Sequence, residues 1–170
     1  MSQTFPTTKE NLKAAFEELR KNLPLLELGE REINGCKMNY FVNAPKSSRE
    51  MYDLVQMLHG DFPFVHEDGK ELNLSEVLSK AKSLANTLHK NGIKANDFVG
   101  ISMQNCTEWI IAYLGITGLG ATCVPFNSWW KEDELSYGIK HSECKVIFVD
   151  KKRYEYVKDL EVQILSLIHI

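Results

Sequence analysis

The feature that most constrains the fold is the alternation of apolar runs and amphipathic segments between residues 73 and 150. Short, near-continuous apolar runs are typical of buried strands. They occur at 98–103, 121–124 and 145–149. Helical periodicity occurs between Asn73 and Gly92, at 109–119 and at 132–141. Strands that alternate with helices pair in parallel, and apolar strands need helices on both faces. The sequence therefore predicts an α/β fold, a partial doubly wound parallel sheet with flanking helices.

Two of the predicted helices carry the same signal at their start. Asn73 is followed three residues later by Glu76, an arrangement that satisfies two free backbone amides at a helix N-terminus. Asn105 and Glu108 repeat this arrangement. Gly92 is expected to end the first of these helices in the left-handed conformation. Both helices are therefore predicted to begin directly after an asparagine cap.

The sequence before residue 73 carries weaker signals. The predicted elements are helices at 10–23 and 49–59 and strands at 38–42 and 62–66. The tetrapeptide from Glu67 to Lys70 predicts a hairpin turn, because the Asp-Gly pair inside it accepts positive φ. No sustained periodicity is present from residue 25 to residue 45. We therefore expect an irregular lead-in before the α/β part.

Right-handed crossovers would bring the loops after the three strands to the carboxyl edge of the sheet, where open α/β folds bind ligands. The candidate residues in these loops are Asn105, Phe126, Asn127, Trp129, Trp130 and Asp150. Trp129 and Trp130 could form a platform for a ligand, but loop aromatics more often serve in packing or at an interface, and such a structural role is expected. Asp150 is the best-placed carboxylate, and we expect it to cap a helix at 151–157. The basic run 151–153 is expected to be solvated.

Other residues that could carry chemistry favour structural roles. Gly118 and Gly120 follow a helix and precede a strand, which reverses the order that a dinucleotide-binding loop needs. His59 and His66 lack a companion carboxylate, so no metal site is predicted. Cys106 opens a helix but has no neighbouring His or Lys that would activate it as a nucleophile. No catalytic or metal-binding residue is assigned, and no cofactor-binding residue is identified.

Charge and cysteine usage narrow the class of protein. The 20 Lys and Arg residues against 23 Asp and Glu residues give a net charge of −3, which argues against a nucleic-acid partner. The four cysteines lie far apart, at Cys36, Cys106, Cys123 and Cys144, and favour reduced thiols. Neither a secretory signal nor an apolar run of about 18–20 residues is present. A cytoplasmic location is therefore expected.

A set of motifs carries a family resemblance. The most specific run is Gly118 to Asn127, and the segment from Asn127 to Tyr137 continues it with the pattern N-x-W-W-x-x-x-E-L-x-Y. Further similar segments are 41–45, 72–78, 92–101 and 105–109. Together they resemble the N-terminal part of the AMP-forming acyl-activating synthetases, and within that family the bacterial medium- and long-chain fatty-acyl-CoA ligases.

The resemblance implies an enzyme that works in two steps. A carboxylate reacts with Mg-ATP to give an acyl-adenylate and pyrophosphate, and the thiol of coenzyme A then displaces AMP. The implied cofactors are ATP, magnesium and coenzyme A, and the implied substrate is a fatty acid or another carboxylate, with peripheral membrane contact left open. The family's Ser/Thr/Gly-rich phosphate loop and its magnesium-binding Glu would follow Asp150, and the 170 residues do not contain them.

We therefore expect three parts in the chain. Residues 1–45 form an N-terminal helix and lead-in. Residues 46–160 form an incomplete first α/β part of the AMP-binding synthetase domain, within the N-terminal subdomain of its large domain. Residues 161–170 form an apolar tail without a turn signal, and from residue 165 they look like a translated sequencing adapter and are expected to be non-native. The chain is thus expected to be a fragment that is inactive alone.

Two alternatives stay open. An aryl acid, an amino acid or a luciferase-like substrate would keep the adenylating chemistry and change only the acid. A complete, non-catalytic α/β module would instead hold a small ligand at the carboxyl edge of a three-stranded sheet. Such a module is expected to unfold cooperatively, whereas an open sheet edge and an apolar tail favour aggregation of a fragment.

Overall fold

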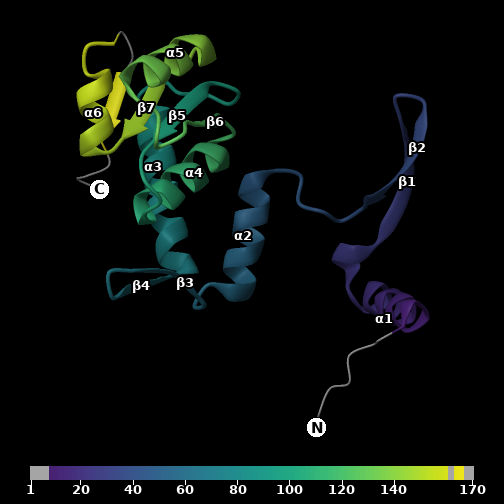
Figure 1. Ribbon diagram of the computed structural model, residues 1–170. Helices are drawn as coiled ribbons and strands as arrows, with labels where there is room; N and C mark the ends of the chain where they lie inside the picture. The colour runs from purple at the N-terminus through teal and green to yellow at the C-terminus, as the bar shows by residue number, and fades with distance from the viewer. Residues whose placement is uncertain (1–7, 161–162, 167–170) are drawn as a thin grey trace. The chain divides into compact units, whose positions relative to one another are not determined.

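The computed structural model describes residues 8–160 and the backbone of residues 163–166. The chain divides into two compact units, Met1–Lys46 and Ser47–Ile170, and each is described by itself (Figure 1). Within the described ranges, no helix has both the length and the apolar character that a membrane crossing requires.

The first unit is a helix followed by a hairpin. Its elements are α1 (Lys9–Asn22), the 3-10 turn η1 (Pro24–Leu26), β1 (Leu28–Ile33) and β2 (Cys36–Phe41). β1 and β2 pair antiparallel around Asn34 and Gly35, whose φ values of 50° and 80° suit a two-residue hairpin turn. The expected helix and part of the expected strand are confirmed. The segment expected to be irregular contains β1, because the Asn-Gly turn returns the chain alongside it.

The second unit contains a hairpin, a parallel sheet and the helices around them. Its elements are α2 (Ser48–His59), β3 (Pro63–Glu67), β4 (Lys70–Asn73), α3 (Leu74–Lys90), β5 (Phe98–Ser102), α4 (Thr107–Leu119), β6 (Thr122–Pro125), α5 (Glu132–Ser142), β7 (Val146–Val149), α6 (Lys151–Val157) and β8 (Gln163–Ser166). The β3–β4 turn has positive φ at Asp68 and Gly69, and Gly92 follows α3 with a φ of 86°. The predicted turn and helix end are therefore confirmed.

The parallel sheet has the strand order β6-β5-β7-β8, and each neighbouring pair runs parallel. Val99 of β5 lies level with Cys123 on one side and with Val146 on the other. The predicted α/β class and parallel pairing are confirmed. The sequence also predicts an unpartnered tail from residue 161, and this differs from the structure, in which the backbone of β8 pairs with β7. The free edge of β7 explains this pairing, since the backbone groups of β7 need hydrogen-bond partners. The other residues of the predicted tail, 161–162 and 167–170, lie outside the described part of the chain.

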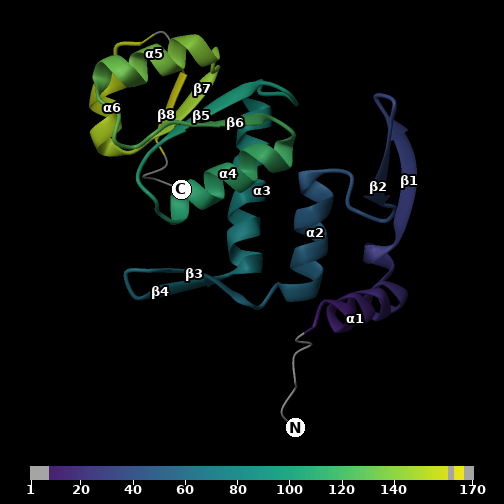
Figure 2. The same cartoon turned by 45° about the vertical axis from the view of Figure 1, so that its right-hand side comes forward.

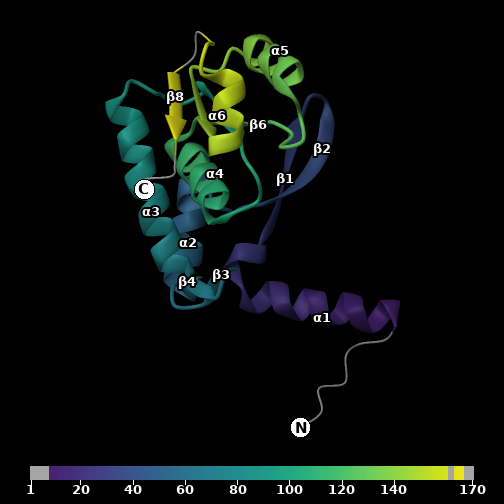
Figure 3. The same cartoon turned by 60° about the vertical axis from the view of Figure 1, so that its left-hand side comes forward.

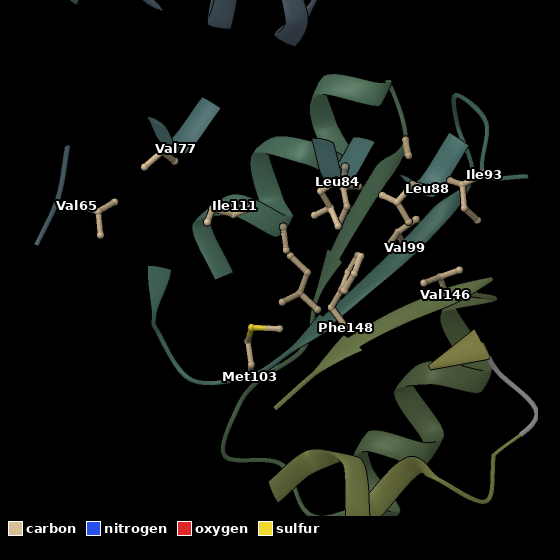
Figure 4. Packing of buried hydrophobic residues seen from close by; sticks show 14 residues of the cluster. Val65, Val77, Leu84, Leu88, Ile93, Val99, Met103, Ile111, Val146 and Phe148 are labelled. Carbon is tan, nitrogen blue, oxygen red and sulfur yellow. The ribbon is translucent and has the colours of Figure 1, made fainter. Parts of the chain in front are cut away.

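Helices cover both faces of the sheet (Figures 2 and 3). α3 and α4 pack on the face that carries Val99, Val146 and Phe148 (Figure 4). α5 and α6 pack on the opposite face, which carries Ile147 and Val149. Successive residues of β7 thus point to opposite sides and are buried on both. This is the doubly wound arrangement that the apolar strands predict.

Of the two predicted asparagine caps, the structure confirms the one at Asn73 and corrects the one at Asn105. Asn73 and Glu76 form the reciprocal box, with the two amide-to-oxygen distances at 2.8 and 2.9 Å. α4, however, begins at Thr107, and Asn105 does not cap it. The carboxylate of Glu67, in the β3–β4 hairpin, accepts hydrogen bonds from the Thr107 amide at 3.0 Å and from the Thr107 hydroxyl. A residue 40 positions away therefore takes the capping role that the local pattern assigns to Asn105.

Candidate functional site

The carboxyl ends of the parallel strands bring three loops to one edge of the sheet. These loops follow β5, β6 and β7. The direction of winding reverses here, because β6 lies on one side of β5 and β7 lies on the other. Open α/β sheets bind ligands at such a switch point. This edge is therefore the candidate functional site.

Asp150 connects two of these loops. Its Oδ2 accepts a hydrogen bond at 3.2 Å from the amide of Gln104, in the loop after β5. Its Oδ1 accepts one at 2.9 Å from the amide of Arg153, so Asp150 caps α6 as the sequence predicts. The carboxylate is thus engaged on both oxygens in holding backbone.

Arg153 extends the connection to the third loop. Its guanidinium donates from Nη1 to Asp150 Oδ2 at 2.8 Å and from Nη2 to the carbonyl oxygen of Ser128. Arg153 is only 4% exposed, although the run 151–153 is expected to be solvated. The two lysines before it are exposed. Helical spacing explains the difference, because Arg153 lies four residues before the buried Val157 and shares its inward face of α6.

The loop after β6 is a fixed turn that carries two tryptophans. The Trp129 amide donates to Asn127 Oδ1 at 2.9 Å, and the Trp130 amide donates to the Asn127 carbonyl oxygen at 3.1 Å. Trp130 packs against Phe126, with ring centroids 6.2 Å apart, and over Gly138, where a Cβ would lie 2.7 Å from the indole. Trp129 is 86% exposed. Trp130 therefore takes the expected packing role, whereas Trp129 does not pack within the described part of the chain.

A groove of about 530 Å³ lies between the β3–β4 hairpin and the start of α4. Its lining includes His66, Glu67, Asn105, Cys106 and Trp109. The hydroxyl and then the amide of Thr107 lower the pKa of the Glu67 carboxyl by hydrogen bonding to it. Burial raises the pKa of the Cys106 thiol. A raised pKa disfavours the thiolate, which argues against Cys106 as an activated nucleophile.

The described residues do not by themselves fit Mg-ATP. Among them, no group of three or more His, Cys, Asp and Glu side chains could hold a metal ion. His59 and His66 accordingly belong to no such group. Gly120 ends α4 with a φ of 86° ahead of β6, so the Gly118 and Gly120 pair does not open a phosphate-binding helix. Arg153 is already paired with a carboxylate, and its unpartnered Nε is enclosed. The described residues of the candidate edge therefore offer no metal-ligand set, and their cations beside Arg153 are the exposed Lys151 and Lys152 at the start of α6.

A comparison with known protein families shows to which family the chain belongs. The model of a family described as "AMP-binding enzyme" matches residues 55–168. The chain belongs to this family. The matched range includes α3, the parallel sheet and the turn with the two tryptophans. The family resemblance of the Gly118 to Tyr137 segment is thereby confirmed.

Curated relatives of this AMP-binding family member differ in their chemistry. A long-chain-fatty-acid–CoA ligase from Bacillus subtilis is 33% identical over 79 residues, which cover 46% of this chain and 14% of the relative. Tyrocidine synthase 1 from Brevibacillus parabrevis is 27% identical over 115 residues, which cover 68% of this chain and 11% of the relative. The chain thus spans only a small part of the length of these proteins.

Solved structures share the fold. A putative long-chain-fatty-acid CoA ligase from Rhodopseudomonas palustris aligns with a TM-score of 0.67 and 23% identity, covering 71% of this chain and 32% of that chain. The anthranilate CoA ligase AuaEII, solved in complex with anthranoyl-AMP, aligns with a TM-score of 0.66 and 19% identity, covering 71% and 25%. The N-terminal subdomain of Klebsiella oxytoca NpsA aligns with a TM-score of 0.65 and 21% identity, covering 71% and 31%. The second unit therefore has the fold of the N-terminal subdomain of these enzymes.

Proposed function

We propose that this chain is the first α/β part of the large domain of an ATP-dependent fatty-acyl-CoA ligase located in the cytoplasm. The observation that carries the proposal is the AMP-binding family match over residues 55–168. The 33% identity to the B. subtilis ligase supports thioester formation as the second step. The proposed cofactors are ATP, magnesium and coenzyme A, with ATP supplying the pyrophosphate leaving group.

The part of the enzyme that this chain provides is a scaffold with one wall at the carboxyl edge. Adenylation needs cations and hydrogen-bond donors that offset the charge developing on phosphate oxygens. At the candidate edge the guanidinium of Arg153 is paired with Asp150, and the Asp150 carboxylate is engaged by backbone amides. We propose that residues outside this chain bind phosphate and metal, and that the 170-residue chain alone is inactive.

A fatty acid is the acid that we propose, with aryl and amino acids as the alternatives. The pattern from Asn127 to Tyr137 supports the fatty acid, because it resembles the medium- and long-chain ligases. The relatives themselves include a long-chain-fatty-acid–CoA ligase, an anthranilate CoA ligase and tyrocidine synthase 1. Since all of these share the same scaffold, the choice of acid needs a direct measurement.

The test is carboxylate-dependent exchange of labelled pyrophosphate into ATP. The full polypeptide produced from the native locus is assayed with octanoic and hexadecanoic acids, with anthranilate and with single amino acids. We expect exchange with a fatty acid to exceed exchange with the other acids by about tenfold or more. Exchange with only an aryl or amino acid would replace the proposed substrate. The absence of exchange with every acid would refute adenylation and favour the non-catalytic ligand-binding module.

A further inference from the structure

One buried ion pair joins all three loops of the carboxyl edge. Asp150 binds the loop after β5 through the Gln104 amide at 3.2 Å and begins α6 itself. Arg153 binds Asp150 at 2.8 Å and the loop after β6 through the Ser128 carbonyl oxygen. The side chains of Arg153 and Asp150 are 5% and 29% exposed, so the pair is largely removed from solvent.

Ser128 lies in the middle of the two-tryptophan turn. The side chain of Asn127 holds the turn from within, since it accepts the Trp129 amide at 2.9 Å. Arg153 holds the same turn from outside, through the carbonyl oxygen of the residue between Asn127 and Trp129. Charge-assisted hydrogen bonds are stronger than neutral ones, and a guanidinium donates in a fixed planar geometry. The conformation of the turn therefore depends on α6, a helix 25 residues further along the chain.

The turn places an apolar side chain in solvent. Trp129 is 86% exposed, whereas Trp130 packs against Phe126. Exposing a whole indole is unusual for a fixed segment, because tryptophans in proteins are largely buried on average. At a ligand-facing edge, an exposed indole on a hydrogen-bonded turn provides a large contact area, and only its two χ angles remain to be ordered.

We propose that Arg153 and Asp150 are positioning residues: they fix the turn at residues 127–130 and thereby hold the backbone that carries Trp129 in a defined position at the carboxyl edge. The proposal rests on the proposed function in one respect, which is the assignment of that edge as ligand-facing. The pair bridges the loops after β5 and β7 at the switch point, and Trp129 lies in the loop after β6.

The test uses the whole chain labelled with 5-fluorotryptophan, whose three signals are assigned with single Trp→Phe variants. Arg153→Met is compared with Lys152→Met, a matched control in the same turn of α6 with an exposed side chain. We expect Arg153→Met to shift the Trp129 and Trp130 signals and leave the Trp109 signal unchanged. We also expect amide exchange at Trp129 and Trp130 to become about tenfold faster, while Val99 and Ile101 in β5 keep their protection.

A conservative variant separates positioning from simple stabilisation. Arg153→Lys keeps one donor, so it should restore part of the Trp129 signal and of the amide protection. A uniform loss of protection throughout the unit, without a selective change at Trp129 and without rescue by lysine, would overturn the proposal. Wild-type spectra and exchange rates in folded Arg153→Met would also overturn it.

A second variant covers the case in which Arg153→Met does not fold. Asp150→Asn keeps a side-chain oxygen that can cap α6 and removes the charge that orients the guanidinium. Selective loss of protection at Trp129 and Trp130 supports the proposal, and unchanged protection refutes it. None of these measurements uses ATP or a carboxylate, so their failure leaves the proposed function standing, and failure of pyrophosphate exchange leaves the positioning role standing.

Discussion

Replacement of Gly115 by alanine tests the close approach of α3 and α4. A Cβ at this position would lie 2.9 Å from the carbonyl oxygen of Ala81 and 3.2 Å from Leu84 Cβ. Distances under about 3.0 Å are not tolerated by real Cβ atoms. The Ala81 oxygen belongs to the backbone of α3 and cannot rotate away, so the two helices would have to separate.

Two opposing contributions set the change in the free energy of unfolding of Gly115→Ala. Alanine in place of glycine stabilises a helix interior by about 1 kcal/mol. Overpacking a core costs about 1–3 kcal/mol, and contact with backbone places this site toward the upper value. Gly115→Ala should therefore lower the free energy of unfolding by about 2 kcal/mol. The matched control is Gly118→Ala in the same helix, where the new Cβ meets only Tyr52 ring atoms at 3.6 and 3.7 Å.

The assay is urea unfolding of the whole chain followed by circular dichroism of the helices. Gly118→Ala should raise the free energy of unfolding by up to about 1 kcal/mol, so the two variants should differ by about 3 kcal/mol at similar m-values. Equal stability of Gly115→Ala and Gly118→Ala would refute the reasoning, because the propensity gain is common to both.

Three further predictions follow from buried or hydrogen-bonded groups. Asp150→Ala should lower the free energy of unfolding by about 3 kcal/mol in the same urea titration, because it leaves the buried Arg153 guanidinium without its carboxylate partner. Adding Arg153→Met to Asp150→Ala should recover part of that loss. Simple additivity of the two single-variant effects would contradict this prediction. Glu67→Gln should destabilise the chain at neutral pH and progressively less as the pH falls below about 4.3. Hydrogen bonds lower the folded-state pKa of Glu67. The stabilisation by the Glu67 carboxylate is therefore present above the ordinary glutamate pKa of about 4.3 and is lost as the pH falls through the lower folded-state pKa. A difference in melting temperature between wild type and Glu67→Gln that does not change with pH would count against this prediction. Burial raises the pKa of Cys123 to about 11, so iodoacetamide near pH 8 should modify the exposed Cys36 first, and peptide mass mapping that found equal rates would disprove this.

The α/β part could be predicted because its signals are local and periodic. The capping box at Asn73 lies within a single turn of helix, and the apolar runs at β5 and β7 are buried on both faces. The capping role of Asp150 could also be predicted, since a carboxylate directly after a strand and before a helical pattern is a typical helix cap. These features require no knowledge of distant contacts.

The features that the sequence did not reveal depend on residues far apart in the chain. Arg153 lies in a basic run, and only its contact with Ser128, 25 residues away, shows why it is buried. Glu67 reaches Thr107 across 40 residues and replaces the expected asparagine cap. Trp129 is 86% exposed in a turn whose Ser128 carbonyl oxygen accepts a hydrogen bond from the distant Arg153. Pattern and spacing alone carry no information on such pairings.

We propose above that this chain supplies the scaffold of an adenylating enzyme and not its chemistry. Pyrophosphate exchange in the presence of Mg-ATP and a fatty acid tests it directly when the 170-residue chain and the full product of the native locus are assayed side by side. The account predicts exchange by the full product and none above background by the 170-residue chain. Exchange catalysed by the 170-residue chain alone would contradict the account, because it would require phosphate- and metal-binding groups within these residues.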